Sequence, residues 1–216
     1  FSYTHNDTEN HADSFTYCAT EGDLNSDTVT VYIGITEVND IPTIVNFDDQ
    51  IDFTEQTSID VDANVEFDDL EVGNLGGATL QLTTNYVEGN DSLECVSPDG
   101  GIICATFNAS TGTLALSGTA SFADYQSTIN NIRFVNNSDN PSELARTLEL
   151  TVEDENDGVM SATASKTINV SAVNDPPTAD ADTYSVDEGD SVDGTTVLTG
   201  DLDPELLDLD IDRTTA

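Results

Sequence analysis

Apolar and polar residues alternate along much of the chain. Between residues 28 and 35, Val29, Val31, Ile33 and Ile35 alternate with small or polar residues. The same period of two recurs at 78–84, 112–118, 146–154 and 166–173. Successive side chains of a β-strand point to opposite faces, so this pattern predicts half-buried strands. The abundance of Thr and Val, which favour strands, agrees with it.

One stretch, at 121–134, departs from this period. Phe122, Tyr125, Ile129 and Ile132 follow the spacing of a helix, and Ser121 precedes them as a good N-cap residue. We expect one or two turns of helix there, covering an open end of a β-sandwich.

Two long stretches of the chain resemble each other. Residues 14–43 and 148–178 both run strand, acidic turn, strand, and then Val-Asn-Asp-x-Pro. Residues 51–59 align in the same way with 184–192. The repeat predicts an all-β protein of tandem antiparallel β-sandwiches. Residues 41–175 would form one complete repeat, between the C-terminal part of one at 1–40 and the N-terminal part of the next at 176–216. We therefore expect a longer protein, with its targeting signals outside this stretch.

The chain is very acidic. It has 43 Asp and Glu residues against 4 Lys and Arg, a formal net charge of −39. Repulsion between so many negative charges can keep a chain disordered. Leu, Ile, Val and Phe nevertheless make up about a quarter of the chain, which is enough to form a core. The charge excludes nucleic acid, whose phosphates require clustered Lys and Arg. It favours Ca²⁺, which prefers oxygen ligands, although many acids would belong to a solvated acidic surface.

Cys95 and Cys104 flank the turn sequence Pro98-Asp99-Gly100-Gly101. Cysteines on either side of a hairpin turn can face each other across the strands, so we expect a disulfide; two buried free thiols are the alternative. A disulfide implies an oxidising compartment. Cys18 has no expected partner.

The segments 38–42 and 173–177, which carry Val-Asn-Asp-x-Pro, resemble the linkers of cadherin repeats. They have the looser form found in cadherin-like tandem repeats of large microbial surface proteins. Residues 112–141 and 146–158 resemble the second half of such repeats, and the resemblance covers essentially the whole chain. It implies Greek-key sandwiches of cadherin or immunoglobulin type, with calcium bound at each junction. Pro42, Pro176 and Pro177 would stiffen the linkers.

The resemblance implies calcium ligands from the domain before, the linker and the domain after. At the first junction these are Glu37, Asn39, Asp40, Asp68, Asp69 and Asp154, with Glu21 the counterpart of Asp154 in the preceding repeat. At the second they are Glu55, Asp124, Asn174, Asp175, Asp201 and Asp203. Converging carboxylates would repel strongly unless a divalent ion neutralised them. The departures from the family pattern predict fewer ions than a full cadherin junction holds, and a plain Pro-stiffened linker remains open.

These features predict a calcium-stiffened spacer or adhesion repeat of an extracellular surface protein. The alternative is a structural subunit of an extracellular filament, hair or surface layer, assembled by lateral packing. Besides Ca²⁺, the expected partners are other surface proteins, glycans or copies of the chain itself. If the chain is eukaryotic and secreted, the Asn-x-Ser/Thr sequons at Asn108 and Asn136 are expected to carry glycans. No apolar run is long enough to span a membrane, and the only histidines, His5 and His11, have no nucleophile signature beside them, so no enzyme is predicted.

Overall fold

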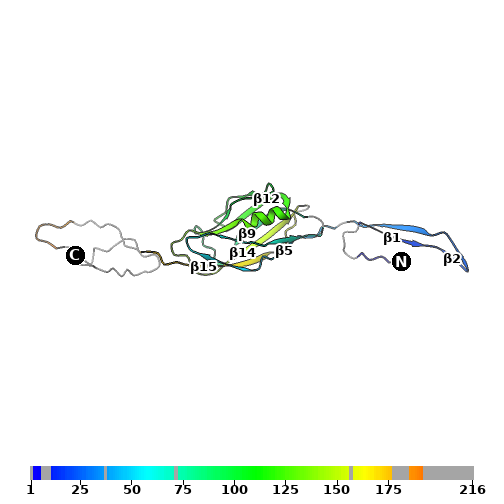
Figure 1. The fold of residues 1–216 in the computed structure, drawn as a ribbon, viewed down its shortest axis with the longest axis horizontal. Coiled ribbons are helices and arrows are strands. Elements are labelled where there is room, and N and C mark those ends of the chain that lie inside the picture. The colour runs from blue at the N-terminus through cyan, green and yellow to red at the C-terminus, as the bar shows by residue number, and fades with distance from the viewer. Residues whose placement is uncertain are drawn as a thin grey trace.

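The fold is known from a computed structural model, which describes residues 2–5, 11–36, 38–70, 73–155, 158–176 and 185–191. Within these ranges the protein is built of β-strands with one helix (Figure 1). A six-stranded and a three-stranded sheet enclose the core, and smaller strand pairs lie beside them. An all-β, sandwich-like fold, as predicted from the period of two, is therefore confirmed.

The larger sheet has the order β11-β12-β9-β14-β15-β6. Its strands are β6 (Gln50–Thr54), β9 (Asn74–Leu82), β11 (Ile103–Cys104), β12 (Thr113–Ser121), β14 (Arg146–Asp154) and β15 (Ala164–Ser171). The alternating segments at 78–84, 112–118, 146–154 and 166–173 all contribute to it. The expected antiparallel pairing holds for the other strand pairs of this sheet, but β6 pairs with β15 in parallel, from Gln50 opposite Thr167 to Thr54 opposite Ser171.

The smaller sheet has the order β10-β13-β7. Its strands are β7 (Ile59–Asp60), β10 (Asp91–Cys95) and β13 (Ile132–Asn136). A further pair, β5 (Thr43–Val45) with β8 (Glu66–Asp68), carries the chain into the sandwich. The two main sheets meet through inward-facing residues such as Phe53 of β6 and Phe134 of β13, whose rings pack edge to face 5.0 Å apart. Both rings are fully buried. The apolar positions of the alternating strands thus stabilise the fold by packing against each other between the two sheets.

The predicted helix is confirmed as α1 (Phe122–Asn130). The Ser121 hydroxyl accepts a hydrogen bond from the Asp124 amide, so Ser121 caps the helix as expected. Tyr125 and Ile129 are fully buried on its inner face, and the Phe122 ring packs against Phe67 of β8. The helix carries the chain from β12 of the larger sheet to β13 of the smaller one.

A hairpin precedes the sandwich in the chain. It pairs β1 (Ala12–Tyr17) with β4 (Val29–Gly34), and its tip holds β2 (Thr20–Glu21) and β3 (Leu24–Asn25). Phe15, Val31 and Ile33 share one face, as the alternation at 28–35 predicts. Among the described residues, no strand pairing joins this hairpin to β5–β15.

Strand register defines two opposite ends of the sandwich. At the first, here called the entry end, Asp154 lies opposite Leu75, and Ser121 lies opposite Asn74. At the second, the exit end, Ser171 lies opposite Thr54. Figure 1 shows the hairpin β1–β4 on the entry side, whereas β15 carries the chain out at the exit side. The two linkers therefore leave the sandwich from opposite ends.

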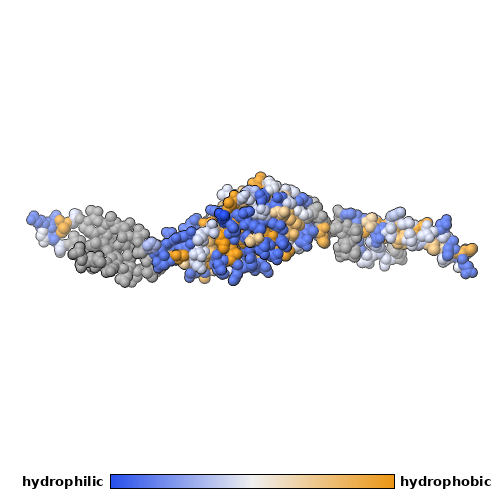
Figure 2. Space-filling view, in the orientation of Figure 1, coloured by the Kyte–Doolittle hydropathy of each residue, from blue (hydrophilic) through white to orange (hydrophobic). Residues whose placement is uncertain are grey.

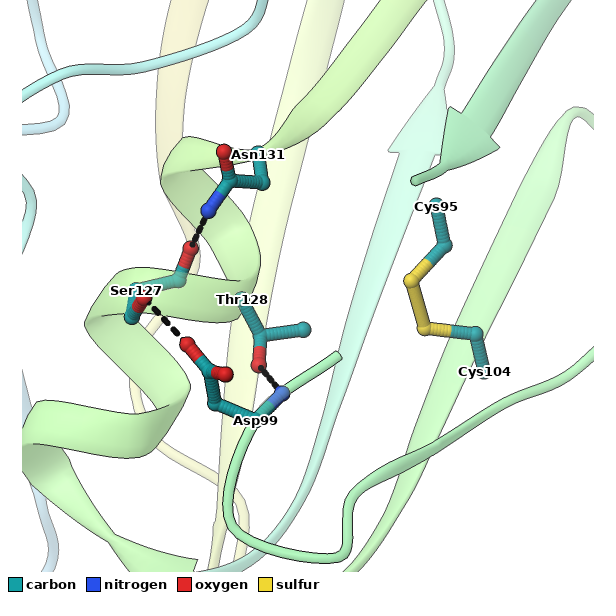
Figure 3. Close-up of a disulfide and its surroundings, with 6 residues drawn as sticks. All are labelled: Cys95, Asp99, Cys104, Ser127, Thr128 and Asn131. Carbon is teal, nitrogen blue, oxygen red and sulfur yellow. Dashed lines mark hydrogen bonds between the residues drawn. A yellow bond between two sulfur atoms is a disulfide. The ribbon is translucent and has the colours of Figure 1, made fainter. Parts of the chain in front are cut away.

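The Cys95–Cys104 disulfide is confirmed, but its setting differs from the expected hairpin. Cys95 lies in β10, which pairs with β13, whereas Cys104 lies in β11, which pairs with β12. Since β10 and β11 are edge strands, the bond links the edges of the two sheets; Figure 3 shows the disulfide itself. The intervening loop is anchored to α1, since the Asp99 amide donates to the Thr128 hydroxyl and the Ser127 hydroxyl donates to the Asp99 carboxylate. Cys18 is an exposed free thiol.

Candidate metal sites at the two ends of the sandwich

The first linker contacts the sandwich at the entry end. Asn39 Nδ2 donates a hydrogen bond of 2.9 Å to Oδ2 of Asp154, the last residue of β14. Asp154 is 2% exposed, so this carboxylate is held inside the protein rather than on its surface. The linker amide and the buried acid thus meet although they are far apart in sequence.

Two further acids of the predicted first site lie where the chain enters the sandwich. Thr43, just after the linker, is opposite Asp68 in the β5–β8 pair, and its hydroxyl donates to the Asp68 carbonyl at 3.1 Å. Asp69 follows directly, and both of its carboxylate oxygens are shielded from solvent. Asp40 is exposed. Glu37 lies outside the described residues.

Glu21 belongs to a different place. It pairs with Leu24 at the tip of the hairpin, whereas the linker leaves from the other end of β4. Asp154 likewise lies next to the turn between β14 and β15. Glu21 and Asp154 thus both lie next to a turn between two paired strands, but Glu21 does not join Asn39 and Asp154.

The second linker contacts a buried acid at the exit end. Glu55 is 2% exposed, and its Oε2 accepts a hydrogen bond of 2.8 Å from the Val173 amide. Its other oxygen, Oε1, is buried and has no hydrogen-bond partner among the described residues. The adjacent Gln56 donates through Nε2 to Oδ1 of Asp175 at 2.5 Å. Asn174 is exposed and donates to the Asp175 carbonyl at 3.1 Å.

The predicted grouping of Asp124 with Glu55 is wrong. Asp124 lies in the first turn of α1, where its Oδ2 accepts from the Ser121 hydroxyl at 2.7 Å. The next residue after Ser121, Phe122, donates its amide to the Gly73 carbonyl at 2.7 Å. These contacts place Asp124 toward the entry end, opposite to Glu55. Asp201 and Asp203, also assigned to the second site, lie outside the described residues.

The structure also brings forward residues that the sequence did not single out. At the exit end, Glu143 accepts a hydrogen bond of 3.3 Å from the Ala172 amide of the linker. At the entry end, the Glu155 carboxylate accepts from Asn74 Nδ2 at 3.2 and 3.4 Å. Glu155 belongs to the acidic stretch after β14 and was recognisable as a candidate there. Glu143 had no such signal, because the fold alone brings it to the linker.

One glycosylation prediction is contradicted. Asn136 is 5% exposed, and its Nδ2, the atom that would carry the sugar, donates to Asp91 at 2.5 Å. Asn108 is exposed, and its Oδ1 accepts from the Ser110 amide and hydroxyl at 3.1 and 2.8 Å. Asn108 thus remains a predicted site.

Both ends of the sandwich carry oxygen-bearing residues of the kind that a hard cation binds. Glu55 Oε1 is buried and receives no hydrogen bond from the part of the chain that the structure describes, and such an oxygen is costly unless a cation or a donor reaches it. Carboxylate, Asn and peptide oxygens, all present at both ends, are the ligands that Ca²⁺ uses. In the part of the chain that the structure describes, no three His, Cys, Asp or Glu side chains already lie close enough to hold a metal ion. A site would therefore draw on Asn and backbone oxygens as well.

No helix among the described residues is long and apolar enough to cross a membrane. No protein-family model matches the sequence, and no curated protein matches it significantly.

Proposed function

We propose that this chain is a calcium-stiffened spacer repeat of an extracellular surface or adhesion protein, of the cadherin-like type. One observation carries the proposal. The two Val-Asn-Asp-x-Pro segments lie at opposite ends of one sandwich, and each is hydrogen-bonded to a buried acid: Asn39 to Asp154 and Val173 to Glu55. Such an arrangement suits repeats that follow one another end to end, with an ion at each junction.

Calcium would act by removing repulsion between the linker and the domain. At the entry end, Asn39, Asp154 and Asp69 would supply oxygens. At the exit end, Glu55, Asn174 and Asp175 would do so, with linker carbonyls completing the shell. Bound calcium supplies positive charge that these acids otherwise lack, since the chain has so few cations. Once the charges of these acids are neutralised, each linker would hold the neighbouring repeats in one relative orientation. A series of repeats would then form a stiff rod.

The alternative is a filament subunit that packs laterally through a broad apolar surface. On the face visible in Figure 2, hydrophilic residues are spread over the sandwich and apolar ones are interspersed among them. A large contiguous apolar patch is what lateral packing would require. This face therefore favours the spacer. The disulfide between the sheets suits an oxidising, extracellular setting for either function.

Thermal unfolding of residues 1–216 in chelator and in millimolar calcium tests the proposal. An ion that binds only the folded state stabilises it by about 2.7 kcal/mol at one hundred times its Kd. The wild-type protein should therefore melt several degrees higher in calcium. X-ray scattering should also give a larger maximum dimension in calcium, and equal dimensions in the two buffers would defeat the stiffening mechanism.

The Glu55→Gln variant separates ligation from ordinary stability. It removes a buried charge, so in chelator it should melt at or above the wild-type temperature. In calcium it should lose much of the gain, because a carboxylate ligand is gone. Glu94→Gln is the matched control, since Glu94 is an exposed acid within β10, opposite Arg133 of β13. If Glu55→Gln and Glu94→Gln responded to calcium alike, Glu55 would not be a ligand.

A further inference from the structure

Lys166 is a lysine in an unusual place. It is the only lysine in the sequence, and it lies in β15 on the same inward face as Ile168 and Val170. Its side chain is entirely shielded from solvent, and its Nζ lies 4.7 Å from the centre of the Phe47 ring. Lysine is almost never fully buried unless it is paired, because its ammonium loses its hydration there.

Two carboxylates flank this amine. Lys166 Nζ contacts Oδ2 of Asp62, whose side chain is also fully buried, and lies 2.6 Å from Oδ1 of Asp49. The other oxygen of Asp62, Oδ1, accepts hydrogen bonds from the amides of Asn64 at 2.7 Å and Val65 at 2.6 Å. Asp49 is about half exposed and so connects the cluster to solvent.

From this geometry we infer that Lys166 and Asp62 condense into an intramolecular amide bond. Each part required for acyl transfer is present. Lys166 Nζ is the nucleophile and lies against the Asp62 carboxyl group, the electrophile. The two backbone amides at Asp62 Oδ1 form an oxyanion hole, and Asp49 is positioned to move protons. Burial favours the product, since a neutral amide replaces a buried ion pair.

The protons and the leaving group balance without any external reactant. Nζ first passes a proton to Asp62 Oδ2, which turns the ion pair into a neutral amine and a carboxylic acid. The amine attacks Cγ of Asp62, and the negative charge forms on Oδ1 between the two amides. Asp49 takes a proton from the nitrogen and returns it to Oδ2. The bond from Cγ to Oδ2 then breaks, one water leaves toward solvent beside Asp49, and the Cγ–Nζ amide remains.

The bond would cross-link distant parts of the chain. Asp62 follows β7 and Lys166 lies in β15, 104 residues later. A pulling force applied through the two linkers would reach the sandwich near β5 and after β15. The cross-link would transmit this force directly from Asp62 to Lys166, so residues 63–165 would not be stretched. The cross-link does not depend on calcium, and either inference can fail while the other stands.

Intact mass spectrometry of the reduced full chain tests the inference. The wild type should be lighter than its sequence mass by one water molecule. In denaturant, an amine-reactive ester should label the N-terminus but not Lys166, and fragmentation should join the peptides of Asp62 and Lys166. Lys166→Arg, which retains the charge but lacks the amine, should have its full sequence mass. A full wild-type mass with a labelled Lys166 would overturn the inference, as would a missing water that leaves Lys166 reactive, because ring closure at Asp99-Gly100 would produce that result.

The Asp49→Asn variant tests the proton-transfer step. It retains both reacting groups and changes only a half-exposed side chain, so it should unfold cooperatively by circular dichroism. We expect the bond to form in only a small fraction of the molecules, with Lys166 open to labelling in the rest. A bond that forms as completely in Asp49→Asn as in the wild type would overturn the role assigned to Asp49.

Discussion

Asn39 and Asp154 are 115 residues apart in the chain, yet Asn39 Nδ2 lies 2.9 Å from Asp154 Oδ2. The contact joins the linker before the sandwich to the last residue of one of its central strands. A hydrogen bond to a buried carboxylate is the kind that adds measurable stability. It therefore gives the first linker a preferred position even before any ion binds.

The Asn39–Asp154 contact can be measured by a double-mutant cycle in chelator. Asn39→Ala, Asp154→Ala and the double variant should give a coupling free energy of about 1–3 kcal/mol, because each single change removes the same hydrogen bond. Urea unfolding provides the free energies. The pair Asn39→Ala with Glu94→Gln is the control and should be additive. A coupling near zero for Asn39 and Asp154 would mean that the linker is not held there.

Arg146 and Arg133 offer a matched comparison of buried and exposed ion pairs. The side chains of Arg146 and Asp91 are both fully buried, with Nε 3.1 Å from Oδ2, whereas those of Arg133 and Asp60 are 45% and 55% exposed at the same distance. Arg146→Met should cost about 3–5 kcal/mol, since it leaves Asp91 charged and buried. Arg133→Met should cost less than about 1 kcal/mol. Equal losses in urea unfolding would contradict the buried placement of Arg146.

Gly100 and Gly101 separate backbone strain from a steric clash. Both have positive φ, 59° and 80°, but only at Gly100 would an added Cβ meet another residue, at 2.5 Å from Asp124 Cγ. Gly101→Ala should cost about 1–2 kcal/mol for the left-handed backbone alone. Gly100→Ala should cost about 2–4 kcal/mol, because Asp124 must also move from the helix cap. Chemical unfolding of the two variants tests the ranking, and a costlier Gly101→Ala would contradict the packing of this loop on α1.

Tyr125 should make the fold sensitive to alkaline pH. Burial, together with the charge of Glu153, raises the pKa of Tyr125 from its ordinary value of 10.0 to about 12. Below pH 10 both states keep the phenol proton. Between pH 10 and about 12 the unfolded chain loses it first, so the free energy of unfolding should fall by about 2–3 kcal/mol across this window.

Unfolding at about pH 9 and about pH 11.5, on either side of the ordinary tyrosine pKa, measures this contribution. Tyr125→Phe loses the hydrogen bond to the Gly118 carbonyl, so it should be less stable at the lower pH, but it should lose less stability on going to the higher one. Tyr32→Phe is the control, since Tyr32 is 82% exposed and should follow the wild type. If Tyr125→Phe had the wild-type pH dependence, Tyr125 would not be the group responsible.

Local patterns in the sequence determined the elements. The alternation at 146–154 predicted β14, and Ser121 with its helically spaced apolar neighbours predicted α1 and its cap. These features depend on a few neighbouring side chains, and the geometry of a strand or a helix turn determines the direction in which each of them points. The turn between Cys95 and Cys104 likewise allowed their disulfide to be predicted, because a short loop keeps two cysteines close.

Only the tertiary structure decided which elements meet. The sequence did not place β6 parallel to β15, put Cys95 and Cys104 in different sheets, or bring Asp124 to the entry end and Glu55 to the exit end. Lys166, at an inward position of an alternating strand, was a visible anomaly, but its partners Asp62 and Asp49 were not. An alternation with a period of two determines which face of the strand a side chain points to. The residues that surround this side chain come from distant segments, which only the packing of the whole core brings together.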